Sequence, residues 1–143
     1  MNIEKTRIYK LREYLLTILD DIRKDKKSSI NANMLSNNVD NYSLDKIPVQ
    51  TNSEKWITGQ IIRKEVYSFR SRVAYSIETI TNLENVGFYE VFESKISSNN
   101  KEGILPTIEN IQEIECLNCG SLVDATTNTA EFDIQIQITY KEG

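Results

Sequence analysis

The chain has 143 residues and a mass of 16.5 kDa, which suits one domain built around one hydrophobic core. Its 17 basic and 21 acidic residues are interleaved and leave a net charge of −4, so the composition gives no reason to expect nucleic-acid binding. The charged amino terminus is unlike a signal peptide, and no stretch reaches the ~18 apolar residues of a membrane span, so we expect a cytoplasmic protein without a membrane partner.

The first predicted element is an amphipathic helix over residues 3 to about 25. Apolar side chains recur there at spacings of three and four, the period of one helix face: Ile8, Leu11, Leu15, Ile18, Leu19 and Ile22. A basic run follows at residues 23 to 27, where the helix dipole favours cations. We interpret this run as a solvated helix end rather than a phosphate-binding patch.

Residues 28 to 45 are predicted to form a long loop, because they contain five asparagines and no sustained apolar period. A loop of this length is uncommon inside one domain. It either reaches a neighbouring subunit or is a surface loop without a partner.

Two strands are predicted next, an irregular one over residues 47 to 58 and a long one over residues 60 to 76, joined as a hairpin near Gly59. The long strand alternates between two groups of side chains: Tyr67, Phe69, Val73 and Tyr75 on one parity, and Lys64, Ser68, Arg70 and Arg72 on the other. About 15 residues of strand would extend ~50 Å, which is longer than the domain. Part of the hairpin is therefore expected to project, and another subunit would pair its free backbone groups.

A second helix is predicted over residues 77 to about 97, with Ser76 as its N-cap. Gly87 indicates a kink or break near residues 85 to 87. Residues 98 to 106 are expected to form a loop.

The final strand, residues 131 to 140, has the clearest pattern in the chain. Apolar residues occupy every second position, namely Phe132, Ile134, Ile136, Ile138 and Tyr140. A third strand at residues 107 to 117 and a turn region at residues 120 to 129 precede it. Because one strand face is apolar and the other polar, we predict an α+β fold: an antiparallel four-stranded sheet with two helices on one face, in the order α-β-β-α-β-β, with a long projecting β-hairpin.

The sequence contains only weak chemical motifs. It has no histidine, the commonest general base and metal ligand. Cys116 and Cys119 have the spacing of half a zinc site but no second pair, so we expect reduced thiols, and zinc would require a second subunit. Glu93 and Lys95 resemble the Glu-x-Lys element of metal-dependent nucleases, with Glu113 as a further ligand, but they fall in a helical period. We therefore predict no catalytic residue, no metal and no cofactor.

Several segments together carry a family resemblance. They are the amino-terminal helix, SLDKIPV at residues 43 to 49, NLENVGFYEVF at residues 82 to 92, and a closing section with Gly120, Asp124, Thr129 and FDIQIQITY at residues 132 to 140. In their joint order and spacing, across residues 3 to 140, the chain resembles the small tail-terminator or tail-completion proteins of long-tailed bacteriophages and prophages of Gram-positive bacteria. The Cys-x-x-Cys pair departs from that pattern.

The resemblance implies a mixed α/β subunit of a non-enzymatic hexameric ring in the tail neck of the virion, assembled in the bacterial host cytoplasm. Such a ring caps the head-proximal end of the tail tube, stops tube polymerisation and joins the head. The implied partners are further copies of the chain, the tail tube protein, a head-completion or connector protein, and a sheath where the tail is contractile. DNA would pass through the ring without specific recognition.

Residues on the long hairpin are our candidates for subunit or tube contacts: Tyr67, Phe69, Arg70 and Arg72. The alternative functions are another neck or head-completion adaptor, a small metal-dependent nuclease that uses Glu93 and Lys95, and an adaptor bridged by zinc through the cysteines. Each alternative makes a different chemical demand on the fold.

Overall fold

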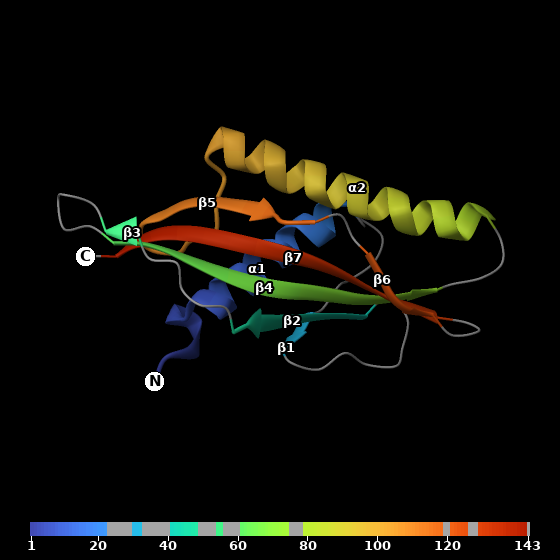
Figure 1. Ribbon diagram of the computed structural model, residues 1–143, viewed down its shortest axis with the longest axis horizontal. Helices are drawn as coiled ribbons and strands as arrows, with labels where there is room; N and C mark the ends of the chain where they lie inside the picture. The colour runs from blue at the N-terminus through green and yellow to red at the C-terminus, as the bar shows by residue number, and fades with distance from the viewer. Residues whose placement is uncertain are drawn as a thin grey trace.

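A computed structural model describes most of the chain, namely residues 1–22, 30–32, 41–48, 54–55, 61–74, 79–118, 121–125 and 129–142. Within this part, the elements form two layers, with both long helices on one face of a sheet (Figure 1). The two longest strands lie side by side at the centre of the sheet. One hydrophobic core fills the space between the layers.

The sheet is built around β4 (Ile61–Ala74) and β7 (Thr129–Glu142), which pair antiparallel over all 14 of their residues. β2 (Asn41–Ile47) is antiparallel to β4 on its other side, and β5 (Ile111–Cys116) is antiparallel to β7. These four strands lie in the order β2-β4-β7-β5. The predicted α+β class, with an antiparallel four-stranded sheet and two helices on one face, is therefore confirmed.

Three short strands extend the sheet. β1 (Ile30–Ala32) runs parallel to β2, β3 (Glu54–Lys55) pairs with the first residues of β4, and β6 (Ser121–Ala125) pairs with β7. The prediction of a turn region at residues 120 to 129 is wrong in part, because residues 121 to 125 form β6. A register shift after Leu122 interrupts its alternation, and such a bulge hides a strand from an argument based on period two.

Alternate residues of the strands form the apolar face of the sheet. Phe69 of β4 is 0% exposed and lies between Tyr42 of β2 and Phe92 of α2, with ring centroids 5.5 and 5.1 Å away and the planes nearly parallel. On β7 every residue of the predicted apolar parity is buried, at 8% exposure or less: Phe132, Ile134, Ile136, Ile138 and Tyr140. Burial of each such side chain contributes about 1.5–3 kcal/mol to folding, which explains why the strands are held in this register.

The first helical segment consists of η1 (Ile3–Lys5) and α1 (Arg7–Ile22). α1 buries the predicted face, chiefly through Leu11, Leu15, Ile18 and Leu19. Tyr14 ties it to the loop after the second helix, because its hydroxyl donates to the Ile104 carbonyl oxygen at 2.9 Å. The basic run at residues 23 to 27 lies outside the described part of the chain.

The second helix, α2 (Thr79–Glu102), differs from its prediction in two ways. It continues without a break through Gly87, around which a larger residue would find open space. It also extends five residues past the predicted end and stops before Gly103, whose φ of +76° is the left-handed conformation that glycine adopts at helix ends. The proposed N-cap, Ser76, is among the residues that the structure leaves undescribed.

Two predictions before β4 are wrong in position. Part of the predicted loop at residues 28 to 45 forms β1 and most of β2, where Ile30, Tyr42 and Leu44 are buried at 1–2% exposure. β2 ends at Ile47, before Pro48, because proline has no amide hydrogen for the ladder. Of the strand predicted at residues 47 to 58, the described part retains only Ile47 and β3.

The projecting hairpin is also corrected. Within the described residues, its two predicted strands pair where β3 faces Ile61 and Ile62 and where Ile47 faces Val66, and the long partner of β4 is β7 rather than the preceding strand. β4 is therefore an interior strand, flanked by β2 on one side and by β7 on the other. The hairpin turn, residues 56 to 60, falls outside the described residues.

Candidate functional site

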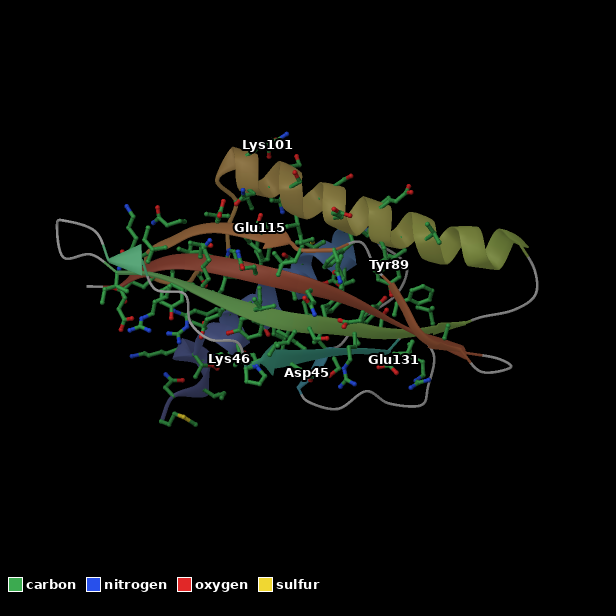
Figure 2. All side chains as sticks on the ribbon, viewed as in Figure 1. Asp45, Lys46, Tyr89, Lys101, Glu115 and Glu131 are labelled. Atoms are coloured by element: carbon green, nitrogen blue, oxygen red, sulfur yellow. The ribbon has the colours of Figure 1, made fainter. Side chains whose placement is uncertain are left out.

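The face of the sheet opposite the helices carries polar side chains from four strands (Figure 2). Side chains alternate along a strand, so the register that buries Phe69 directs Arg70 to this polar face. β2 contributes Asp45, β7 contributes Glu131 and β5 contributes Glu115. These side chains make the polar face a continuous surface across the width of the sheet.

The centre of this face is an ion-pair network that we name the polar-face cluster: Asp45, Arg70, Arg72 and Glu131. Arg70 reaches across to both neighbouring strands, with Nη2 2.7 Å from Asp45 Oδ2 and Nη1 3.4 Å from Glu131 Oε1. Arg72 lies 3.8 Å from the other oxygen of Glu131. The four side chains are 15–30% exposed, so the cluster is partly open to a partner.

Hydrogen bonds continue the pattern on both sides of the cluster. The Ser68 hydroxyl donates to Asp133 Oδ1 at 2.6 Å, and the Gln137 amide donates to Glu115 Oε1 at 2.9 Å. Each of these carboxylates accepts a hydrogen bond from a neighbouring donor. The polar face can therefore present donors and acceptors in fixed positions, as a surface contact requires.

A second ionic site lies on the other face, around Glu65 of β4. Arg7, the first residue of α1, donates to both Glu65 oxygens at 2.6 and 3.1 Å, and Lys46 at the end of β2 donates at 2.6 Å. The Tyr67 hydroxyl adds a hydrogen bond at 3.3 Å. We name these four residues the Glu65 cluster. It joins the first helix to the end of the sheet.

Burial and charge act in opposite directions on Glu65, which is 4% exposed. Burial raises the pKa of its carboxyl, but hydrogen bonds and charges from Arg7 and Lys46 together outweigh burial, so the pKa lies below the usual value of 4.5. The same surroundings raise the pKa of Tyr67, first through burial and then through the negative charge of Glu65. Glu65 is therefore ionised and Tyr67 neutral near pH 7.

The structure divides the four predicted contact residues between the two faces. Tyr67 and Phe69 are 1% and 0% exposed and pack in the core, so their side chains have no surface to offer a neighbouring subunit. They lie in the core because they share the parity of the strand positions that face the helices. Arg70 and Arg72 lie together on the polar face, where a partner could reach them.

The residues of the alternative functions are not brought together. Lys95 is bound to Asp21 of α1 at 2.6 Å, and Glu93 lies on α2 at the apolar face, whereas Glu113 lies opposite Thr139 on the polar face. Within the described residues, no three Cys, Asp or Glu side chains are placed to hold a metal ion. Cys116 packs partly buried against the core, and its proposed zinc partner at position 119 belongs to the undescribed part of the chain.

The Glu65 cluster was missed in the sequence, although a signal for it was present. Glu65 shares the parity of Tyr67 and Phe69 and is therefore an acidic residue at a core position of the long strand. A buried carboxylate requires cationic partners. Which cations supply them depends on tertiary contacts, since Arg7 is 58 residues away in the chain.

Comparison with known proteins gives no family. No protein-family model matches the chain, and no curated protein matches it. Among the helices that the structure describes, none is both long and apolar enough to cross a membrane. The function therefore has to be argued from the segments of the sequence and from the two faces of the sheet.

Proposed function

We propose that the chain is a structural subunit of a phage tail-terminator ring. Six copies would cap the head-proximal end of the tail tube, stop its polymerisation and provide the surface that joins the head. The proposal is carried by the joint order of the segments at residues 43 to 49, 82 to 92 and 132 to 140.

The fold supports this proposal because the three segments meet in one unit. Residues 43 to 49 overlap β2, residues 82 to 92 lie in α2, and residues 132 to 140 lie in β7. Tyr89 of α2 packs on Phe132 of β7 with ring centroids 5.2 Å apart. Segments far apart in sequence therefore act as parts of a single core, as a shared fold requires.

The polar face is the surface that we assign to contacts within such a ring or with the tube. A ring contact is heterologous, which means that one patch of a subunit meets a different patch of the next. Arg70 and Arg72 are two cations held by carboxylates from the same sheet face, so they are positioned before any partner arrives. In this proposal the enzyme alternatives are set aside and no cofactor takes part. The partners are further copies, the tube protein, a head connector and, in a contractile tail, the sheath.

The test is assembly of the tail tube protein with and without the chain, followed by negative-stain electron microscopy. We expect tubes of limited length with extra density at one end when the chain is present, and longer open tubes without it. Arg70→Glu should lower the fraction of capped tubes, whereas the matched control Lys101→Glu, on the exposed end of α2, should not. Unchanged tube lengths and bare tube ends with the intact chain would contradict the proposal.

A second neck role, as a head-completion adaptor, rests on the same surfaces and differs in its partner. Co-expression with the connector protein and with the tube protein, each in a separate pull-down, separates the two roles. Binding to the connector alone would identify the adaptor. Capture of the tube protein would identify the terminator.

A further inference from the structure

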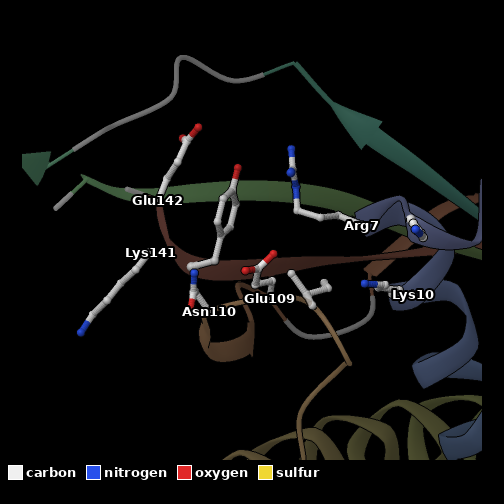
Figure 3. Close-up of a pocket in the computed structure, with 9 residues that line it drawn as sticks. Arg7, Lys10, Glu109, Asn110, Lys141 and Glu142 are labelled. Carbon is white, nitrogen blue, oxygen red and sulfur yellow. The ribbon is translucent and has the colours of Figure 1, made fainter. Parts of the chain in front are cut away.

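The amino-terminal helical segment, the residues before β5 and the end of β7 line an open pocket of about 400 Å³ (Figure 3). Lys5, Arg7 and Lys10 line it from η1 and α1, and Ile108 and Tyr140 line it from the loop before β5 and from β7. Four basic and two acidic side chains surround the pocket, in a protein whose net charge is −4. The pocket is therefore a local excess of positive charge on an acidic molecule.

Arg7 is held in place before any ligand binds. Its guanidinium is anchored by Glu65 and lies over the Tyr140 ring, 4.8 Å from the ring centroid. The side chain is nevertheless 44% exposed, so one face of it remains accessible from the pocket. An immobilised cation of this kind loses little conformational freedom on binding an anion.

Lys5 and Lys10 supply charge that the chain does not use internally. Neither forms an ion pair with any residue in the described ranges. Ile108 and Tyr140 also line the pocket, but they are only 5% and 8% exposed, so the side chains that a ligand would meet are chiefly polar and charged. The pocket therefore offers a ligand the positive charges of Lys5 and Lys10.

We propose that this pocket binds a short acidic peptide segment of a protein partner. Its carboxylates would meet Lys5 and Lys10, and the local excess of positive charge selects for such a segment. A nucleic-acid backbone fits less well, because a long polyanion would extend beyond the pocket over a protein whose net charge is −4. The proposal does not depend on the ring function, since it concerns a different surface from the polar face.

The test measures fluorescence anisotropy of a labelled pentapeptide that contains four glutamates around one phenylalanine, titrated with the intact chain at low salt. We expect saturable binding that Lys10→Glu weakens about tenfold or more and that 0.5 M NaCl largely removes, because opposite charges at a partly exposed site are screened. The matched control is Lys101→Glu, which makes the same charge change on the exposed last turn of α2 and should leave binding within about twofold. Lys5→Glu provides a second variant at the pocket.

Three results would overturn the proposal. They are no saturable binding up to millimolar chain, equal weakening by Lys10→Glu and Lys101→Glu, and displacement of the peptide by single-stranded DNA of equal charge at lower concentration than by unlabelled peptide. A pentapeptide with leucine in place of phenylalanine should still bind, whereas one with lysines in place of the glutamates should not. These outcomes leave the capping assay unaffected, so failure here is distinguishable from failure of the ring proposal.

Discussion

The two faces of the central strands, β4 and β7, differ in the interactions that constrain their side chains. On the apolar face, Phe69 is stacked between two rings and 0% exposed, so its size and shape are set by packing. One residue further along, Arg70 is 30% exposed and makes ion pairs at the surface. Surface ion pairs contribute little to stability, so the polar face is the part of the sheet whose residues can be selected for contacts with other molecules.

Glu65 is the exception that tests this division. It is a carboxylate on the apolar face, and it is 4% exposed, whereas the carboxylates of the polar-face cluster keep 15–21% of their side chains exposed. A buried charge that loses its partner costs far more than an exposed one. The predictions below therefore compare apolar packing, the buried ionic cluster and the exposed ionic cluster in that order.

The largest effect is expected from Phe69→Ala. The substitution removes the middle ring of the stack with Tyr42 and Phe92 and leaves a cavity, which should lower the free energy of unfolding by about 3–5 kcal/mol. Urea denaturation followed by circular dichroism measures it. The control is Gln135→Ala on the polar face of β7, with an expected change of about 0.5 kcal/mol or less. Equal losses in the two variants would contradict the division between faces.

Arg7→Ala should have the next largest effect. It removes a bidentate partner from a buried carboxylate while Lys46 remains, so we expect a loss of about 1–3 kcal/mol in the free energy of unfolding. Lys10→Ala is the matched control on the same helix and should change stability by about 0.5 kcal/mol or less. If Arg7→Ala cost no more than this control, the Glu65 cluster would be no more important to stability than an exposed charge.

The pH dependence of stability should report the same carboxylate. The pKa of Glu65 is lowered by folding, so its contribution is fully present above the unfolded-state value near 4.5 and is lost as the pH falls through the folded-state pKa. Urea midpoints between pH 3 and pH 7 should therefore decrease on the acidic side. Glu65→Gln removes the titrating group and should flatten that decrease. A profile that is unchanged in this variant would show that other carboxylates control the acid transition.

The sequence predicted the elements whose period is regular. The alternation of β7 and the spacing of Leu11, Leu15 and Ile18 in α1 each bury one continuous face, and both were placed correctly within a few residues. β2 was missed because only Tyr42 and Leu44 mark its apolar parity and asparagines precede it. A short strand depends more on its neighbour than on its own pattern.

The candidate site was less predictable than the fold. The parity of Tyr67 and Phe69 was visible in the sequence, but the core face could be assigned only after β4 was known to be an interior strand rather than half of a projecting hairpin. The polar-face cluster likewise requires the register that brings β2 and β7 to opposite sides of Arg70. Such cross-strand contacts join residues more than 20 positions apart, so the local sequence pattern does not predict them.

The smallest effect is expected in the polar-face cluster, and a double-mutant cycle of Asp45→Ala and Arg70→Ala measures it. The two groups are 2.7 Å apart but 21% and 30% exposed, so we expect a coupling of about 0.2–1 kcal/mol that decreases in 0.5 M NaCl. Glu131 keeps a contact with Arg72 when Arg70 is removed, which limits the decrease in the free energy of unfolding further. A coupling above about 2 kcal/mol would mean that the polar-face cluster stabilises the fold as strongly as the Glu65 cluster does. The residues on both faces of the sheet would then be constrained by stability. A small coupling would show that the Asp45–Arg70 pair contributes little to folding. The free energy of unfolding of Arg70→Glu itself, measured in the same way, would then separate a loss of stability from a loss of the tube contact in the capping assay.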